Sequence, residues 1–163
     1  MRGLSWCALS LCVAFAAAGS YDEILKEDAL GLSPLKKSAA EFLRALEHKR
    51  GAPFSREELR KIFASKVPEL TALQSESGPV QIKAIREWVI SVAPVLHADA
   101  NEFSDHLPLN KVLEKACGIL GVEAYQDGVE HPHRKAKELV GKMREFTQAV
   151  IEAFNRRNEK QEL

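Results

Sequence analysis

Apolar residues recur at intervals of three and four along most of the chain, which is the spacing of one face of an α-helix. The pattern holds from residue 33 onward. No stretch alternates apolar and polar residues with an enrichment in β-branched types, as a half-buried strand would. We therefore expect an all-α protein, folded as a compact bundle of about five main helices with short loops. The pattern allows a short β-hairpin only at 122–130, around the pair Asp127-Gly128.

Capping residues and prolines indicate where the predicted helices begin and end. Ser33-Pro34 begins the first helix and Gly51 ends it, because an N-cap serine, an early proline and a left-handed C-cap glycine are typical of helix ends. The second helix begins at Ser55, which forms a capping box with Glu58: the hydroxyl bonds forward to the backbone and the carboxylate bonds back to it. The remaining helices are expected at 79–94, 109–120 and 132–158, with a short helical piece at 69–74.

Each predicted helix has one apolar face, and these faces form the candidate core. Their residues are Leu35, Ala39, Phe42, Leu46, Leu59, Ile62, Phe63, Val67, Ile82, Ile85, Val89, Val92, Leu109, Val112, Leu113, Ala116, Leu120, Ala136, Leu139, Val140, Met143, Phe146, Val150 and Phe154. A core of this size can stabilise a domain without disulfides. The sequence thus predicts one helical domain over residues 19–154.

The first residues have the pattern of a secretory signal peptide. Arg2 precedes an uncharged apolar run from Leu4 to Phe15, and small residues follow up to Ser20. The run is shorter than the roughly 20 residues that a membrane-spanning helix needs, and small residues of this kind mark a cleavage site. We expect residues 1–18 to be removed as a signal peptide. The mature chain is then expected to be soluble, with no membrane insertion.

The last four residues resemble a retrieval signal of the endoplasmic reticulum. Lys160, Gln161, Glu162 and Leu163 differ from Lys-Asp-Glu-Leu only at the second place. A receptor reads such an address from an unpacked chain end, so we expect residues 155–163 to be a flexible tail. This predicts a KDEL-type retrieval receptor as a partner and the endoplasmic-reticulum lumen as the location. The alternative is secretion with a coincidental tail.

Composition and motifs exclude several classes of function. The 163 residues include 23 Lys plus Arg and 23 Asp plus Glu, so the formal net charge is +0. Nucleic-acid binding depends on cations that neutralise many phosphates, and we expect no nucleic-acid partner. The sequence lacks the motifs of phosphate-binding loops, dinucleotide sites, zinc proteases and serine hydrolases. We therefore expect no enzyme activity and no cofactor.

The histidine-rich part of the chain does not predict a metal site. Its candidate ligands are His97, Asp99, His106, His131 and His133. Their spacing puts no two imidazoles on one helical face, which is the arrangement of zinc-binding histidines on a helix. We expect no metal, and a metal-dependent hydrolase is the weakest alternative.

The start of the last predicted helix has an unusual excess of cations. His133, Arg134, Lys135 and Lys137 lie in its first two turns, where the helix dipole disfavours a positive charge by about 0.3–1 kcal/mol. We interpret these residues as a binding site for an acidic partner. Reversing the charge at Arg134 and Lys135 should then stabilise the isolated domain slightly.

Cys117 is the only cysteine outside the predicted signal peptide. Because it lies at the edge of an apolar face, we expect an inert, half-buried thiol. The alternative is a mixed disulfide with a partner in an oxidising compartment.

Together these features predict a non-enzymatic helical protein of the endoplasmic-reticulum lumen. We expect it to bind a lumenal client or partner protein as a chaperone accessory or escort. The alternative is a secreted helical effector, or a protein that encloses an apolar ligand between its helices.

Overall fold

The computed structural model describes residues 21–26, 33–96 and 106–162, with side chains as far as Glu159. Residues 21–26 are helical, and the elements that follow are α2 (Pro34–Arg50), α3 (Arg56–Leu59), the π-helical turn η1 (Arg60–Ala64), α4 (Lys66–Leu73), α5 (Gly78–Leu96), α6 (Leu109–Leu120) and α7 (Pro132–Glu162). No strand occurs in these residues, 122–130 included. The predicted all-α bundle is confirmed. The predicted signal peptide lies outside the described residues.

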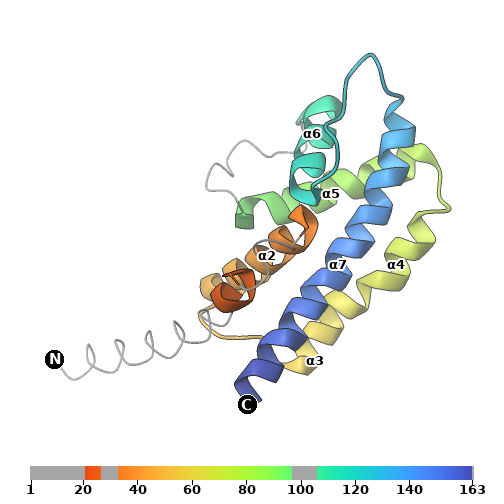
Figure 1. Ribbon diagram of the computed structural model, residues 1–163. Helices are drawn as coiled ribbons and strands as arrows, with labels where there is room; N and C mark the ends of the chain where they lie inside the picture. Colours follow the sequence, from red (N-terminus) through yellow and green to blue (C-terminus); the bar gives the residue numbers. More distant parts are fainter. Residues whose placement is uncertain (1–20, 27–32, 97–105, 163) are drawn as a thin grey trace.

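Helix α7 is the central element of the bundle. It is 31 residues long and contacts α2, α4, α5 and α6. Figure 1 shows α3 and α4 along one side of α7, α2 and α6 on the other, and α5 crossing behind α7. Among the described residues, no helix has both the length and the apolar character that crossing a bilayer requires.

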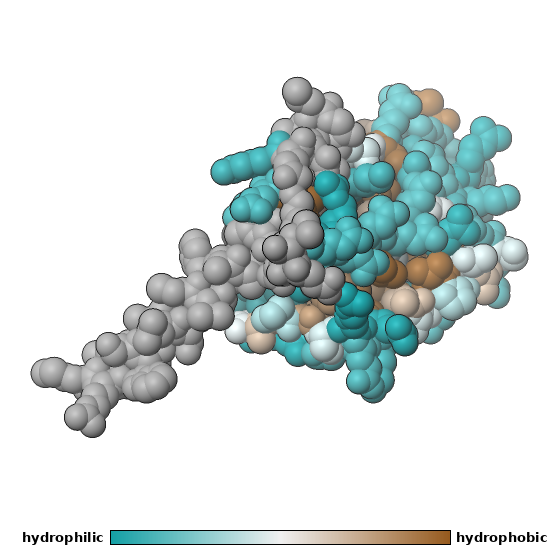
Figure 2. Space-filling model, turned by 60° about the horizontal axis from the view of Figure 1, so that its bottom comes forward, coloured by the Kyte–Doolittle hydropathy of each residue, from teal (hydrophilic) through white to brown (hydrophobic). Residues whose placement is uncertain are grey.

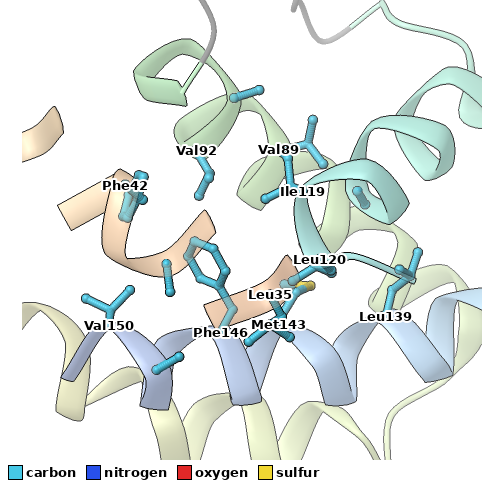
Figure 3. Close-up of a cluster of buried hydrophobic side chains, with 14 of the residues drawn as sticks. Leu35, Phe42, Val89, Val92, Ile119, Leu120, Leu139, Met143, Phe146 and Val150 are labelled. Carbon is cyan, nitrogen blue, oxygen red and sulfur yellow. The ribbon is translucent and has the colours of Figure 1, made fainter. Parts of the chain in front are cut away.

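The core lies where α2, α5 and α6 meet α7. Phe146 of α7 rises toward α2 and α5 (Figure 3), and its ring centroid is 5.6 Å from that of Phe42 and 5.3 Å from that of Trp88. The face shown in Figure 2 is mostly hydrophilic, with apolar residues only in small patches. The predicted core residues are buried or packed against the core, except Ile62 and Val67.

The helix ends predicted at Ser33, Gly51 and Ser55 are confirmed by their capping interactions. The Ser33 hydroxyl accepts a hydrogen bond from Lys36 N–H (3.3 Å), and Gly51 ends α2 with φ 82°. In the capping box, Glu58 N–H donates to the Ser55 hydroxyl and Ser55 N–H donates to the Glu58 carboxylate, both at 3.1 Å. Local sequence is sufficient to set these ends.

The π-helical turn η1 explains why Ile62 is 44% exposed instead of buried. Ser65 N–H donates to the carbonyl of Arg60, five residues earlier (3.1 Å). Pro68 lies four residues after Ala64; it has no N–H to donate to that carbonyl, and its ring would crowd it. The extra residue in the turn accommodates Pro68 and changes the direction of the side chains. Of the η1 residues, only Phe63 is buried in the core.

Helix α7 extends further than the apolar pattern predicts. The helix was expected to end at 158 and runs to Glu162. The flexible tail expected from 155 overlaps this helix, and its first residues are not free, since Arg157 is only 2% exposed. Arg157 donates to the Glu47 carboxylate of α2, a contact between residues 110 positions apart that an apolar pattern does not reveal. Lys160, Gln161 and Glu162 continue the helix.

Candidate functional site

A groove lies at the end of the bundle where α7 begins. The loop at 121–131 leaves the end of α6, runs back beside it and enters α7 (Figure 1). It forms an open groove of about 610 Å³ lined by Leu109, Asn110, Tyr125, Asp127, Gly128, Val129, Glu130, His131 and Pro132. Val129 is 77% exposed on its wall. The groove therefore offers a large apolar side chain to solvent.

Glycines and one aromatic residue determine the path of this loop. Gly121 ends α6 with φ 67° and packs so tightly on α2 that an added Cβ would lie 2.5 Å from Pro34 Cβ. Gly128 has φ 83° in the turn at the tip. Tyr125 is buried beneath the loop, and its hydroxyl donates to Asp127 (3.4 Å). Burial, together with the charge of Asp127, raises the pKa of Tyr125.

His131 and His133 connect the groove to the start of α7. His133 N–H donates to His131 Nδ1 (3.2 Å), so the imidazole of His131 accepts a bond that a capping side chain usually accepts. The two rings are 5.1 Å apart. His133 also packs against α5, where a Cβ on Gly78 would lie 2.6 Å from its ring.

The four predicted partner-binding cations do not form a single patch. Successive residues of a helix point in directions about 100° apart, so His133 lies against α5, Lys135 points inward, and Arg134 and Lys137 lie in solvent. Among the described residues, neither Arg134 nor Lys137 has an ion-pair partner. Of the predicted cluster, Arg134 and Lys137 stay exposed, as does His133 beside α5, whereas Lys135 is buried.

Lys135 differs from the prediction because it is buried and paired. It is 5% exposed, and its Nζ lies 3.3 Å from a Glu138 carboxylate oxygen and 3.6 Å from one of Glu130. Burial alone would lower the pKa of Lys135, but Glu138, with Cys117 and Glu130, raises it above its usual value. Lys135 therefore anchors the loop to α7 and is not accessible to a partner.

Cys117 is more deeply buried than expected. It belongs to the core face of α6. Burial raises the pKa of its thiol, an effect that the charge of Lys135 opposes. A mixed disulfide needs an accessible thiolate, and the folded chain offers none at this position.

The candidate metal ligands are only partly described. His97 and Asp99 lie outside the described residues, whereas His106, His131 and His133 lie within them. In the described ranges, no group of three or more His, Cys, Asp or Glu side chains is arranged to hold a metal ion.

The opposite end of the core has a second polar site, which we did not predict. Glu47 and Arg157 are 8% and 2% exposed and form an ion pair. The signal was present in the sequence, because Glu47 continues the buried face of α2 after Leu43, and Arg157 continues that of α7 after Phe154. A charged residue in such a register points to a buried partner.

The predicted retrieval residues are described only by their backbone. Lys160, Gln161 and Glu162 form the last turn of α7, their side chains lie outside the description, and so does Leu163. The retrieval signal stays a prediction.

No family model, no curated protein and no solved structure matches this chain. The function has to be inferred from its own residues and their geometry.

Proposed function

We propose that this chain is a non-enzymatic, protein-binding helical protein of the endoplasmic-reticulum lumen, where it acts as a chaperone accessory or escort. The signal-peptide pattern of residues 1–18 and the retrieval-like residues 160–163 support the compartment. The groove beside α7, with the exposed cations Arg134 and Lys137 at the same end of the bundle, is the proposed partner surface.

The observation that carries the binding role is the exposure of Val129 on the wall of the groove. Burying a valine side chain is worth about 1.5 kcal/mol or more, so a partner that covers Val129 gains this free energy. Arg134 and Lys137 have no carboxylate partner among the described residues, and they attract acidic side chains to this end. The two features together fit a partner surface that combines an apolar side chain with acidic residues.

Site-specific crosslinking in the lumen tests this surface. A photoreactive amino acid replaces Val129 in one variant and Ile62 in the control. Ile62 is a matched control because it is an exposed apolar residue on η1, outside the groove. We expect a discrete crosslinked partner from position 129 that is absent from position 62. The crosslink should disappear when Arg134→Glu and Lys137→Glu are added.

Equal crosslinking from both positions would contradict the proposed surface. Crosslinking that survives both charge reversals would remove the acidic partner from the proposal and leave only the apolar contact.

A truncation tests the compartment separately. The full chain and a chain that ends at Glu159 are expressed in secretory cells, and the fraction in the medium is measured. We expect the full chain to stay in the cell and the shortened chain to be secreted, because the shortened chain lacks the residues that a retrieval receptor reads. Secretion of both chains would contradict lumenal residence.

A further inference from the structure

The long helix α7 is capped by a histidine. The helix begins at Pro132, so His131 is its N-cap residue. A side-chain atom in this position accepts a hydrogen bond from one of the first N–H groups of the helix. Here the acceptor is His131 Nδ1 and the donor is His133 N–H (3.2 Å). The His131 carbonyl accepts from Lys135 N–H (3.2 Å) and closes the first turn. The start of α7 is therefore held by a side chain that can bind a proton.

A proton on the imidazole of His131 would remove this cap. A neutral imidazole has one nitrogen that accepts a hydrogen bond, whereas in the charged form both nitrogens carry a hydrogen and donate. His133 N–H would then lose its acceptor. Histidine is the side chain whose charge changes between about pH 5 and pH 8. The caps of α2 and α3 are serine hydroxyls, which do not titrate in this range.

The second imidazole, that of His133, lies beside the N-terminal ends of two helices. Its ring is 5.1 Å from that of His131, and it packs against Gly78, the first residue of α5. The positive end of a helix dipole disfavours a cation, and neither α5 nor α7 has an acidic residue in its first turn to offset this. Two charged imidazoles so close together would also repel each other. Both rings are therefore placed where the neutral form is favoured.

The carboxylates near the two rings are not paired with them. Asp127 and Glu130 line the same groove. Asp127 accepts from the Tyr125 hydroxyl (3.4 Å), and a carboxylate oxygen of Glu130 lies 3.6 Å from Lys135 Nζ. Glu76 lies in the turn before α5. Within the described ranges, none of these three carboxylates forms an ion pair with either histidine, so no such contact compensates a charge on the imidazoles.

The other charged groups close to the rings are mostly positive. Arg134 and Lys137 belong to the first two turns of α7 and are exposed. Burial alone would lower the pKa of Lys135, but Glu138 raises it above its usual value, so this side chain stays charged. The α6 residues that line the groove are uncharged. A proton on either imidazole would add to this positive region.

We propose that His131 and His133 form a pH switch that opens the groove in mildly acidic surroundings and releases a partner from it. His131 and Pro132 form part of the groove wall beside Val129. When His131 takes up a proton, the first turn of α7 loses its cap and the wall moves with it. The open form binds the proton more tightly than the closed form does, so a falling pH favours the open form. Release of a partner rests on the proposed function of the groove, whereas the change of shape does not.

Hydrogen exchange of the purified chain without residues 1–18 tests the switch in the absence of a partner. Rates for the segment 126–136 are divided by those of an unstructured peptide at the same pH, so that only protection by structure is compared. We expect protection to fall about threefold to tenfold between about pH 8 and about pH 5.5, as the loss of an N-cap would cause. The segment 55–65 is the internal control, because its cap is the hydroxyl of Ser55.

Three substitutions separate the cap from other effects of acid. His131→Asn keeps a capping acceptor that binds no proton, so its protection should be the same at both pH values. His131→Ala has no acceptor and should be weakly protected at both. His133→Gln keeps the N–H donor and removes the second titrating ring, so the change with pH should become smaller but should not vanish.

Three results of the exchange measurement overturn the switch. One is an equal fall of protection in the unmodified chain and in His131→Asn. Another is an equal fall in the segment 55–65, because acid would then loosen the whole bundle. The third is a rise of protection at the lower pH, which would show that Asp127 and Glu130 stabilise the charged imidazole.

Crosslinking from position 129 connects the switch with a partner. Permeabilised microsomes that contain the chain with a photoreactive amino acid in place of Val129 are irradiated at the same two pH values. We expect the crosslink to weaken at least about threefold at the lower pH, and to be equally strong at both when His131→Asn is added. A crosslink that does not weaken in the chain with His131 would overturn release. No crosslink at either pH would contradict the proposed function of the groove, while hydrogen exchange still decides whether the switch exists.

Discussion

The two ends of α7 treat their cations in opposite ways. At the start of the helix, Arg134 and Lys137 are exposed and have no ion-pair partner in the described residues, while Lys135 is paired with two carboxylates that reach solvent. Near the end of the helix, Arg157 is enclosed by Glu47 and two aromatic rings. The comparison shows that the direction in which a cation points on the helix, and not its charge, decides whether it stabilises the fold or faces a partner.

The two ends should differ in stability for the same reason. Removing one member of a buried ion pair leaves an uncompensated charge away from water, whereas exposed charges are screened and contribute little. The end at Arg157 is therefore expected to be stabilised by its polar contacts. The end at Val129 is expected to open more readily and to accept a partner.

The largest expected effect is at Arg157. Arg157→Leu should lower the free energy of unfolding by about 3–5 kcal/mol, because Glu47 then stays buried without its counter-charge. Urea denaturation measures the loss. Adding Glu47→Leu should recover part of it, since two apolar side chains replace the pair but Phe54 N–H loses its acceptor. A single-variant loss below about 1 kcal/mol would show that water reaches this end and would remove the contrast.

A smaller effect is expected at Lys135, and it reverses the initial prediction. Lys135→Glu should lower the free energy of unfolding by about 2 kcal/mol, because three carboxylates then meet, two of them partly exposed. Arg134→Glu is the matched control one residue earlier, and it should raise stability by about 0.3–1 kcal/mol through the helix dipole. Denaturation of both variants at low salt checks the signs. Equal effects would mean that Lys135 is not held inside.

Tyr21 has a buried hydroxyl that makes no hydrogen bond of ordinary geometry within the described residues, although Glu47 and Arg157 both act on its pKa. Tyr21→Phe should raise the free energy of unfolding by about 1 kcal/mol, because it removes a buried hydroxyl without a hydrogen bond. Tyr125→Phe makes the same chemical change at the other end, where the hydroxyl donates to Asp127, and should give no gain. Thermal unfolding of the two variants provides the comparison, and a loss in Tyr21→Phe would mean that the hydroxyl is bonded.

The smallest effect near neutral pH is expected at Cys117. Burial raises the pKa of its thiol above the ordinary value of 9.0, so the unfolded chain loses the proton first as the pH rises. Cys117 therefore contributes fully to the free energy of unfolding below the ordinary pKa of its thiol. This contribution is lost as the pH rises through the raised pKa of the folded state. Denaturation between about pH 7 and pH 10 should show a steeper decline for the unmodified chain than for Cys117→Ala. Parallel curves would indicate an exposed thiol.

Much of the fold could be predicted from neighbouring residues. Ser33, Gly51 and the pair Ser55 and Glu58 form the caps that their residue types predict. The apolar faces also predicted most of the core. Ile62 was placed wrongly because the π-helical turn before Pro68 shifts the helical phase, and the pattern was assumed to follow a regular α-helix.

The candidate sites were predicted less well. The cations at the start of α7 could be found from their unfavourable position on the helix dipole, but the burial of Lys135 depends on Glu130 and on α6 behind it. The contact of Tyr21 with the Glu47–Arg157 ion pair was not predicted. It joins residues 21, 47 and 157, which are brought together only when α2 and α7 pack.

The amino-acid sequence alone determined the helices, their caps and the apolar face of each, because hydrogen bonds and side-chain contacts within a helix join residues at most a few positions apart. The tertiary structure decided which charges are enclosed, which are exposed and where grooves form. These depend on how each helix is rotated about its axis against its neighbours, and that rotation is set by packing between segments that lie far apart along the chain.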